Sequence, residues 1–147
     1  MGRTIAWATL AAGTLDILFA AILSLIRGRA PADMLRFVAS GPFPQATEWG
    51  AAGAWLGLAT HFALMAVMAA VFVIAAQRRP ALTAKPLQWG VIYGLITYVV
   101  MNLIVVPLRF PTAWPPKPIG IATQLFAHIV LVGIPIALIA ARRPRTR

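Results

Sequence analysis

The chain contains no cysteine, and only 3 of its 147 residues are acidic. Without cysteine there is no disulfide, no thiolate metal ligand, no thiol nucleophile and no covalent haem attachment through Cys-x-x-Cys-His. The sequence also lacks a glycine-rich phosphate loop, a Gly-x-Ser-x-Gly elbow and a His-Glu-x-x-His motif. These absences leave catalysis open and favour a protein that is not an enzyme.

Apolar residues are abundant instead. They make up 61% of the chain, and the mean hydropathy is +0.83, which is far from the balance of a soluble domain. The net charge of +10 would suggest nucleic-acid binding in a soluble protein. In a membrane protein, basic residues gather at the ends of the spans and meet anionic lipid. The expected partner is therefore the lipid bilayer and not nucleic acid, with a homo-oligomer or a larger membrane complex as further candidates.

Four apolar runs are long enough to cross a hydrocarbon core of about 30 Å. The second of them, residues 51–77, has no charged residue and carries His61 near its middle. A helix that is apolar on every face for that length belongs in lipid. We expect an all-α membrane protein with one domain, a four-transmembrane-helix bundle, whose spans cover residues 5–26, 51–77, 87–106 and 119–141.

The first run is longer than the core of a signal peptide, contains Asp16 and is followed by a poor cleavage site, so we expect a retained helix. In the first long loop, residues 31–39 begin with a proline and end before Ser40-Gly41-Pro42. This pattern predicts a short interfacial helix. The second long loop, residues 107–118, holds five prolines and excludes a regular helix. Both loops are expected to cover the mouth of a polar site.

Basic residues predict the orientation. With both termini inside, eight basic residues lie on the inner side and five on the outer side. The inner segments are short, which is where the positive-inside rule applies best. We therefore predict a multi-pass protein of the bacterial inner (plasma) membrane with both termini in the cytoplasm, N-in and C-in.

Polar residues fall at one depth in this topology. Each span carries one of them nine or ten residues from its outer end, which is about 14–15 Å below the outer boundary. Two more lie about one turn above this level. All follow stripes of small or polar residues, such as Gly53-x-x-x-Gly57 and Gly90-x-x-x-Gly94, that favour helix association. The candidate ligand-binding or proton-binding residues are Asp16, His61, Tyr98, Asn102, Gln124 and His128.

Three hypotheses follow from this polar layer. In the first, the side chains only satisfy one another and make helix packing specific, as in a membrane scaffold or accessory subunit. In the second, Asp16 is a titratable site of proton- or cation-coupled transport or of small-ligand binding, with the histidines as shuttles. In the third, His61 and His128 are axial ligands of a haem b, with Gly57 giving space to the ring, or hold a non-haem metal together with Asp16.

Several segments resemble a group of small four-helix inner-membrane proteins of proteobacteria, and the likeness covers nearly the whole chain. It implies the four-helix topology and transfers no activity. The small multidrug transporters offer an analogy, because they have four helices and an acidic residue in the first. Here that residue is Asp16 and not glutamate, and the outer loops are longer. The segments of the first resemblance are Gly13-Thr14-Leu15-Asp16-Ile17, Ala39-Ser40-Gly41-Pro42-Phe43, Leu56-Gly57-Leu58-Ala59-Thr60-His61-Phe62, Tyr98-Val99-Val100-Met101-Asn102 and Val132-Gly133-Ile134-Pro135-Ile136-Ala137.

Overall fold

The computed structural model describes residues 1–142, and at Ala113 it describes the backbone alone. Every regular element in that part is helical, which confirms the all-α prediction. The elements, in chain order, are α1 (Gly2–Ile26), α2 (Pro31–Ala39), η1 (Pro44–Glu48), α3 (Gly50–Arg78), α4 (Ala81–Ala84), α5 (Pro86–Tyr98), η2 (Val99–Val105), α6 (Val106–Arg109), η3 (Pro111–Ala113), α7 (Pro118–Phe126), η4 (Ala127–Gly133) and α8 (Ile134–Ala141).

Four helices within residues 1–142 are long and apolar enough to cross a membrane. Span 1 is α1 and span 2 is α3. Span 3 joins α5, η2 and α6 over Pro86–Arg109, and span 4 joins α7, η4 and α8 over Pro118–Ala141. The helix expected over residues 31–39 is present as α2, with those bounds. Its position at a membrane surface stays a prediction.

Proline positions explain several helix starts. Pro31, Pro86 and Pro118 are each the first residue of a helix. The first helical N–H has no partner inside the helix, and proline fixes φ near the helical value, so a proline there costs nothing. Pro107 behaves differently from the prediction, because it lies inside span 3 and the helix continues to Arg109.

The two interior prolines follow widened turns. The π-helical segments η2 and η4 each end two residues before a proline, Pro107 in span 3 and Pro135 in span 4. A proline ring clashes with the carbonyl four residues earlier and cannot donate to it. The wider π turn places that carbonyl away from the ring, so the helix continues. Asn102 and His128 lie within these two segments.

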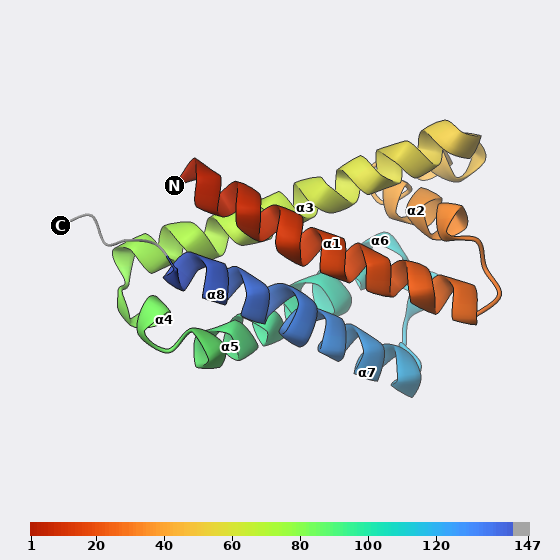
Figure 1. Ribbon diagram of the computed structural model, residues 1–147. Helices are drawn as coiled ribbons and strands as arrows, with labels where there is room; N and C mark the ends of the chain where they lie inside the picture. Colours follow the sequence, from red (N-terminus) through yellow and green to blue (C-terminus); the bar gives the residue numbers. More distant parts are fainter. Residues whose placement is uncertain (143–147) are drawn as a thin grey trace.

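Both chain ends that the structure describes lie at one end of the molecule, the terminal end, and the two long connections lie at the other, the loop end (Figure 1). Span 1 packs on α3 along one side and on η4 and α8 along the other, and α5 packs on η4 and α8. The buried core lies toward the terminal end. It contains Ala8, Ala12, Met65, Ala69, Phe72, Val73, Val132, Ile136, Ala137 and Ala140.

Glycines allow spans 3 and 4 to touch through their backbones. A Cβ placed on Gly94 would lie 2.5 Å from the Cα of Ile129, and one on Gly90 would lie 2.7 Å from the Cα of Ile134. One on Gly133 would overlap the backbone of Gly90. The predicted small-residue stripe of span 3 is therefore confirmed as a close helix contact.

We expect Gly94→Ala to destabilise the protein by about 1–3 kcal/mol, because the added methyl group must push two helix backbones apart. Gly120→Ala is the matched control, since a Cβ there meets nothing within 4 Å. Unfolding in mixed detergent micelles, followed by circular dichroism, measures both. Equal stability of the two variants would contradict the close crossing.

Candidate functional site

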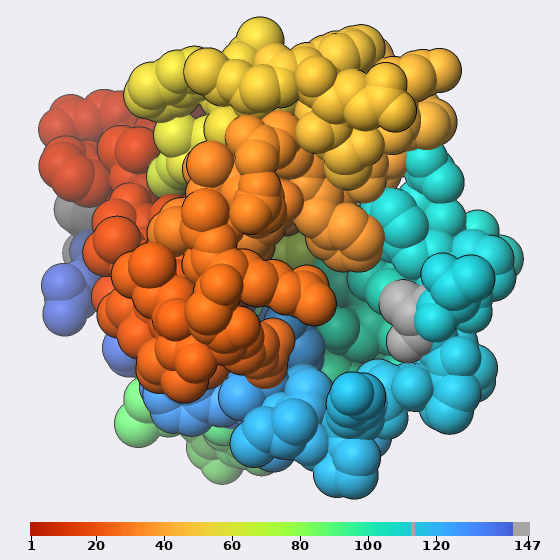
Figure 2. Space-filling model, turned by 90° about the vertical axis from the view of Figure 1, so that its right-hand side faces the viewer, coloured from red at the N-terminus to blue at the C-terminus, as the bar shows by residue number. Residues whose placement is uncertain are grey.

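A cavity of about 1190 Å³ opens at the loop end, between spans 1 and 2 on one side and spans 3 and 4 on the other. Seen from that end, the molecule is hollowed between the orange segment of α1 and α2, the cyan segment that follows span 3 and the blue start of span 4 (Figure 2). Five of the six predicted site residues line it. These are Asp16, His61, Asn102, Gln124 and His128.

His61 connects spans 1 and 2. The His61 side chain is only 8% exposed, and its Nε2 lies 2.9 Å from the backbone oxygen of Gly13. Its Nδ1 lies 3.8 Å from Oδ2 of Asp16, whose side chain is 17% exposed. The carboxyl group of Asp16 and the ring of His61 therefore face each other at the distance of an ion pair. Gly13 is the part that the sequence did not indicate, because a backbone carbonyl carries no signal in the side-chain pattern.

The contacts of His61 limit which atoms of His61 and Asp16 can carry a hydrogen. A carbonyl oxygen can only accept, so Nε2 of His61 donates its hydrogen to Gly13. A neutral imidazole then presents a lone pair at Nδ1, and an ionised Asp16 would face it with a second acceptor. The pair becomes favourable when one proton lies between them, on the carboxyl group or on a cationic ring. One proton placed between the two groups would therefore satisfy both of them.

His128 has a separate partner. The side-chain amide of Asn102 donates to Nε2 of His128 at 3.3 Å, joining the π-helical segments of spans 3 and 4. Nδ1 of His128 then carries the hydrogen, and it is buried without a hydrogen-bond partner among residues 1–142. The ring of Tyr98 packs edge-on against His128, with ring centroids 6.0 Å apart. Tyr98 is buried there and does not line the cavity.

The structure therefore brings the predicted residues together as two pairs in one cavity, Asp16 with His61 and Asn102 with His128. Gln124 is an exposed residue on the cavity wall, without a side-chain hydrogen bond within residues 1–142. Five of the six predicted polar residues therefore share one cavity, and their depth in a membrane stays a prediction. No continuous relay of hydrogen bonds joins the two pairs in the described part of the chain.

Hydrogen bonds between the end of span 3 and the loop after α2 close part of the cavity mouth. We call this link, formed by Arg109 with Ser40 and Gly41, the strap. Arg109, at the end of span 3, donates from Nε to the carbonyl of Gly41 at 2.6 Å and from Nη2 to the carbonyl of Ser40 at 2.8 Å. Next to it, the rings of Phe37 and Phe110 stack with centroids 4.5 Å apart. The two long loops therefore meet over the polar site, as expected. No motif in the sequence indicates these two carbonyl contacts of Arg109.

The glycine stripe of span 2 contacts the first long loop, at α2 and η1, and not a neighbouring span. A Cβ on Gly57 would overlap the backbone carbonyl of Leu35 in α2, and one on Gly53 would overlap that of Ala46 in η1. The helix α2 therefore lies directly on the backbone of α3. This corrects the expectation that Gly57 leaves space for a haem ring, because the backbone of α2 fills that space.

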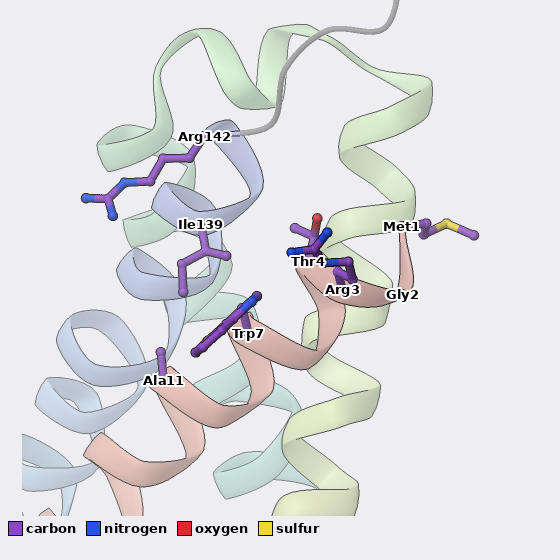
Figure 3. A pocket seen from close by; sticks show the side chains of 8 residues that line it. All are labelled: Met1, Gly2, Arg3, Thr4, Trp7, Ala11, Ile139 and Arg142. Carbon is purple, nitrogen blue, oxygen red and sulfur yellow. The ribbon is translucent and has the colours of Figure 1, made fainter.

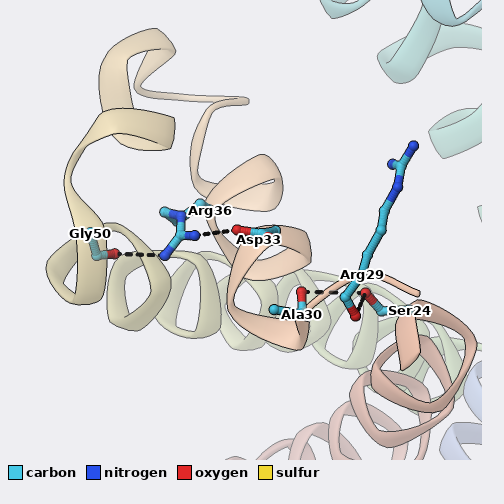
Figure 4. Close-up of polar contacts among 6 residues, drawn as sticks. All are labelled: Ser24, Arg29, Ala30, Asp33, Arg36 and Gly50. Atoms are coloured by element: carbon cyan, nitrogen blue, oxygen red, sulfur yellow. Dashed lines mark hydrogen bonds and ion pairs between the residues drawn. The ribbon is translucent and has the colours of Figure 1, made fainter. Parts of the chain in front are cut away.

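The end of span 1 places two arginines at the mouth. Gly28, at φ +70, adopts the left-handed conformation that ends α1, with Gly28 N–H donating to Leu25 and Arg29 N–H donating to Ser24. The hydroxyl of Ser24 then donates to the carbonyls of Arg29 and Ala30 (Figure 4). The guanidinium of Arg29 points away from these contacts, and both Arg27 and Arg29 line the cavity.

The other two arginines of the mouth are held by the chain. Arg36 pairs with Asp33 one turn earlier in α2 and donates to the carbonyl of Gly50 at 3.3 Å (Figure 4). Arg109 has the two carbonyl partners described above. The cavity is thus lined by four arginines and two aspartates. This excess of positive charge at the mouth disfavours a cation and favours an anion.

Comparison with family models found no match, and neither did comparison with curated proteins or with solved structures. The resemblance to small inner-membrane proteins therefore stays a prediction, and the site has to be interpreted from its own chemistry.

The two histidines differ in how their ring nitrogens are bonded. An axial ligand needs a free ring nitrogen, and its other nitrogen usually donates to a carbonyl or carboxylate. Nε2 of His61 donates to Gly13 and Nε2 of His128 accepts from Asn102, while Nδ1 of His128 donates to no group within residues 1–142. Among the same residues no three His, Asp or Glu side chains are close enough to hold a metal ion. A two-His-plus-Asp metal site is therefore not assembled within residues 1–142, and haem ligation by His61 and His128 stays a prediction.

A second hollow, of about 940 Å³, lies at the terminal end between the first turns of α1 and the end of α8 (Figure 3). Trp7 and Arg3 come from α1, and Arg142 directs its guanidinium away from them. Trp7 is 63% exposed. An exposed tryptophan beside arginines is typical of the headgroup level of a membrane, and the hollow adds no further chemistry to the site.

Proposed function

We propose that the protein is a membrane-embedded binding protein that takes a small ligand into the cavity at the loop end and exchanges one proton at Asp16 and His61, as in proton-coupled transport. The observation that carries this proposal is the location of the pair. Asp16 faces His61 at 3.8 Å on the wall of a 1190 Å³ cavity, so the proton site and the ligand space are continuous. An ionisable pair inside a span is costly, and such pairs commonly mark ion or proton pathways.

The proposed setting is an inner membrane that the four spans cross as an antiparallel bundle, with the terminal end in the cytoplasm and α2 at the outer surface. In the sequence, the segments assigned to the inner side carry eight basic residues and those assigned to the outer side carry five, which supports this orientation. The cavity then opens to the outer side. The packing hypothesis remains the alternative, because His61 also joins span 1 to span 2 through Gly13.

Labelling with a hydrophobic carbodiimide distinguishes proton exchange at Asp16 from a role in helix packing alone. It dissolves in lipid and adds to a protonated carboxyl group, and the adduct rearranges to a stable acylurea that is detected as added mass. The chain has only three acidic residues, Asp16, Asp33 and Glu48, so the assignment by peptide mapping is clear. We expect labelling of Asp16 in vesicles, with a rate that falls as the pH rises and ionises the carboxyl group.

Asp16→Asn should abolish this label, and Asp33→Asn, the matched control, should preserve it. A membrane-impermeant carbodiimide added to intact cells should label Asp33 and Glu48 if the loop end is outside. An Asp16 that stays unlabelled at every pH in folded protein, and reacts once the protein is unfolded, would refute an exchangeable proton and leave the packing function.

A further inference from the structure

The cavity has an open side as well as a mouth. Toward the terminal end, spans 2 and 3 touch, since the hydroxyl of Tyr93 donates to the carbonyl of Met68 at 2.7 Å and its ring packs against Phe72. Toward the loop end the cavity extends between α3 and η2. Exposed apolar side chains of the two helices line the cavity there, from Leu64 and Val67 on α3 and from Val105 on η2.

This side opening faces the hydrocarbon of the bilayer, because it lies between two spans and its edges are apolar. A molecule dissolved in the membrane can therefore reach the cavity without passing the strap formed by Arg109. The cavity wall is mainly apolar along this path, with Met68 and Met101 adding flexible side chains. Such a wall suits a hydrocarbon chain of variable shape.

The head of the ligand is indicated by the arginines. Arg27 and Arg29 line the cavity at the outer end of span 1, and their side chains make no hydrogen bond or ion pair within residues 1–142. Arg36 and Arg109 are already held by Asp33, Gly50, Ser40 and Gly41. Two unpaired guanidinium groups at headgroup level suit a carboxylate or phosphate, which each can bind through two hydrogen bonds.

We propose that the cavity binds a single-chain anionic amphiphile from the membrane, with its acidic head on Arg27 and Arg29 and its hydrocarbon chain in the opening between α3 and η2. This inference rests on the proposed function, since it names the ligand of the same cavity. It also follows from charge complementarity, because the lining carries four arginines and two aspartates. A lipophilic cation would meet unfavourable charge at the same mouth.

A photoreactive fatty acid with a diazirine in its chain tests the site directly. The protein is reconstituted in vesicles of zwitterionic phospholipid, irradiated with the probe and mapped by peptide mass spectrometry. We expect crosslinks concentrated on residues 61–68 of α3 and 99–106 of span 3. Unlabelled fatty acid should compete, whereas the fatty alcohol of equal length should compete about tenfold less well, because it lacks the charge that the arginines bind.

Arg27→Gln with Arg29→Gln should lower crosslinking in the cavity about tenfold. Arg78→Gln with Arg79→Gln removes the same charge at the terminal end and should leave the crosslinking unchanged. Circular dichroism checks that both double variants fold, which is expected because the side chains of Arg27 and Arg29 make no hydrogen bond or ion pair within residues 1–142.

Three results would overturn the proposal. Equal competition by the fatty alcohol would show that the head is not recognised. Crosslinks spread evenly over all lipid-facing surfaces would show that the cavity is not the site. Competition by butyrate as strong as that of the fatty acid would make the ligand a water-soluble anion. In each case, carbodiimide labelling of Asp16 in the same vesicles tests the proposed proton site independently of the ligand.

Discussion

Replacing His61 with leucine is expected to destabilise the protein by about 2–3 kcal/mol, whereas Asp16→Asn is expected to cost about 1 kcal/mol or less. His61 has two partners, the carbonyl of Gly13 at 2.9 Å and Oδ2 of Asp16 at 3.8 Å, and leucine removes both contacts. Loss of one partner of a fully buried ion pair costs about 3–5 kcal/mol, and we expect less here because the cavity gives water access to Asp16.

Asp16→Asn is mild for a chemical reason. Nε2 of His61 already donates to Gly13, so Nδ1 is an acceptor in the neutral ring. An asparagine amide has the shape of the carboxyl group and can donate to that nitrogen. The variant therefore keeps the packing and removes the exchangeable proton, which is the separation that the carbodiimide experiment requires.

A double-mutant cycle tests whether the two side chains act on each other. Asp16→Asn combined with His61→Leu should cost less than the sum of the two single changes, because an amide is cheaper than a carboxylate to leave unpaired. Unfolding of the four proteins in mixed micelles gives the coupling free energy. Strict additivity would mean that Asp16 does not interact with His61 in the folded protein.

Arg109→Gln is expected to speed amide hydrogen exchange in residues 40–46 about 100-fold. The side chain makes two charge-assisted hydrogen bonds, to Gly41 at 2.6 Å and to Ser40 at 2.8 Å. At about 1.5 kcal/mol for each bond, their loss lowers the free energy of local opening by about 3 kcal/mol. This corresponds to an increase of about 100-fold in the population of the open state.

Arg109→Lys should give a partial effect, because lysine keeps the charge and lacks the planar group that reaches both carbonyls at once. Lys117→Gln removes one charge from the same connection and is the matched control, since its side chain makes no hydrogen bond or ion pair within residues 1–142. Hydrogen exchange measured by mass spectrometry compares the three variants. An unchanged rate in Arg109→Gln would show that the stacked rings of Phe37 and Phe110 hold the cover alone.

The spans and the helix over residues 31–39 could be predicted because they depend on local sequence. Length, hydropathy and a leading proline each act within one segment. The pairing of Asp16 with His61 could also be predicted, because a costly polar group in each of two neighbouring spans favours their contact. In these cases the physical cause is contained in the residues themselves.

Other features depend on contacts between elements that are far apart in the chain, and the sequence of one segment does not predict such contacts. Gly57 was expected to face a ring or another span, but it meets the backbone of Leu35, which lies in a loop helix. Pro107 was expected to end span 3, whereas the π turns of η2 let the helix continue. Arg109 has no sequence signal for its two carbonyl partners, because backbone acceptors are present at every position.

The uneven packing along the molecule has a mechanical consequence. The alanine-rich core and the contact of Gly90 and Gly94 with span 4 hold the helices together toward the terminal end. Toward the loop end, the hydrogen bonds of Arg109 link span 3 to the loop after α2. The helices are therefore packed more tightly toward the terminal end, here called the joint, than toward the loop end, where the rings of Phe19 and Phe126 also link spans 1 and 4. A span of about 20 residues is about 30 Å long, so a tilt of about 5° at the joint separates the tips by roughly 2.6 Å. A rotation this small changes the width of the gap by more than half the diameter of a hydrocarbon chain, while the core at the joint hardly moves.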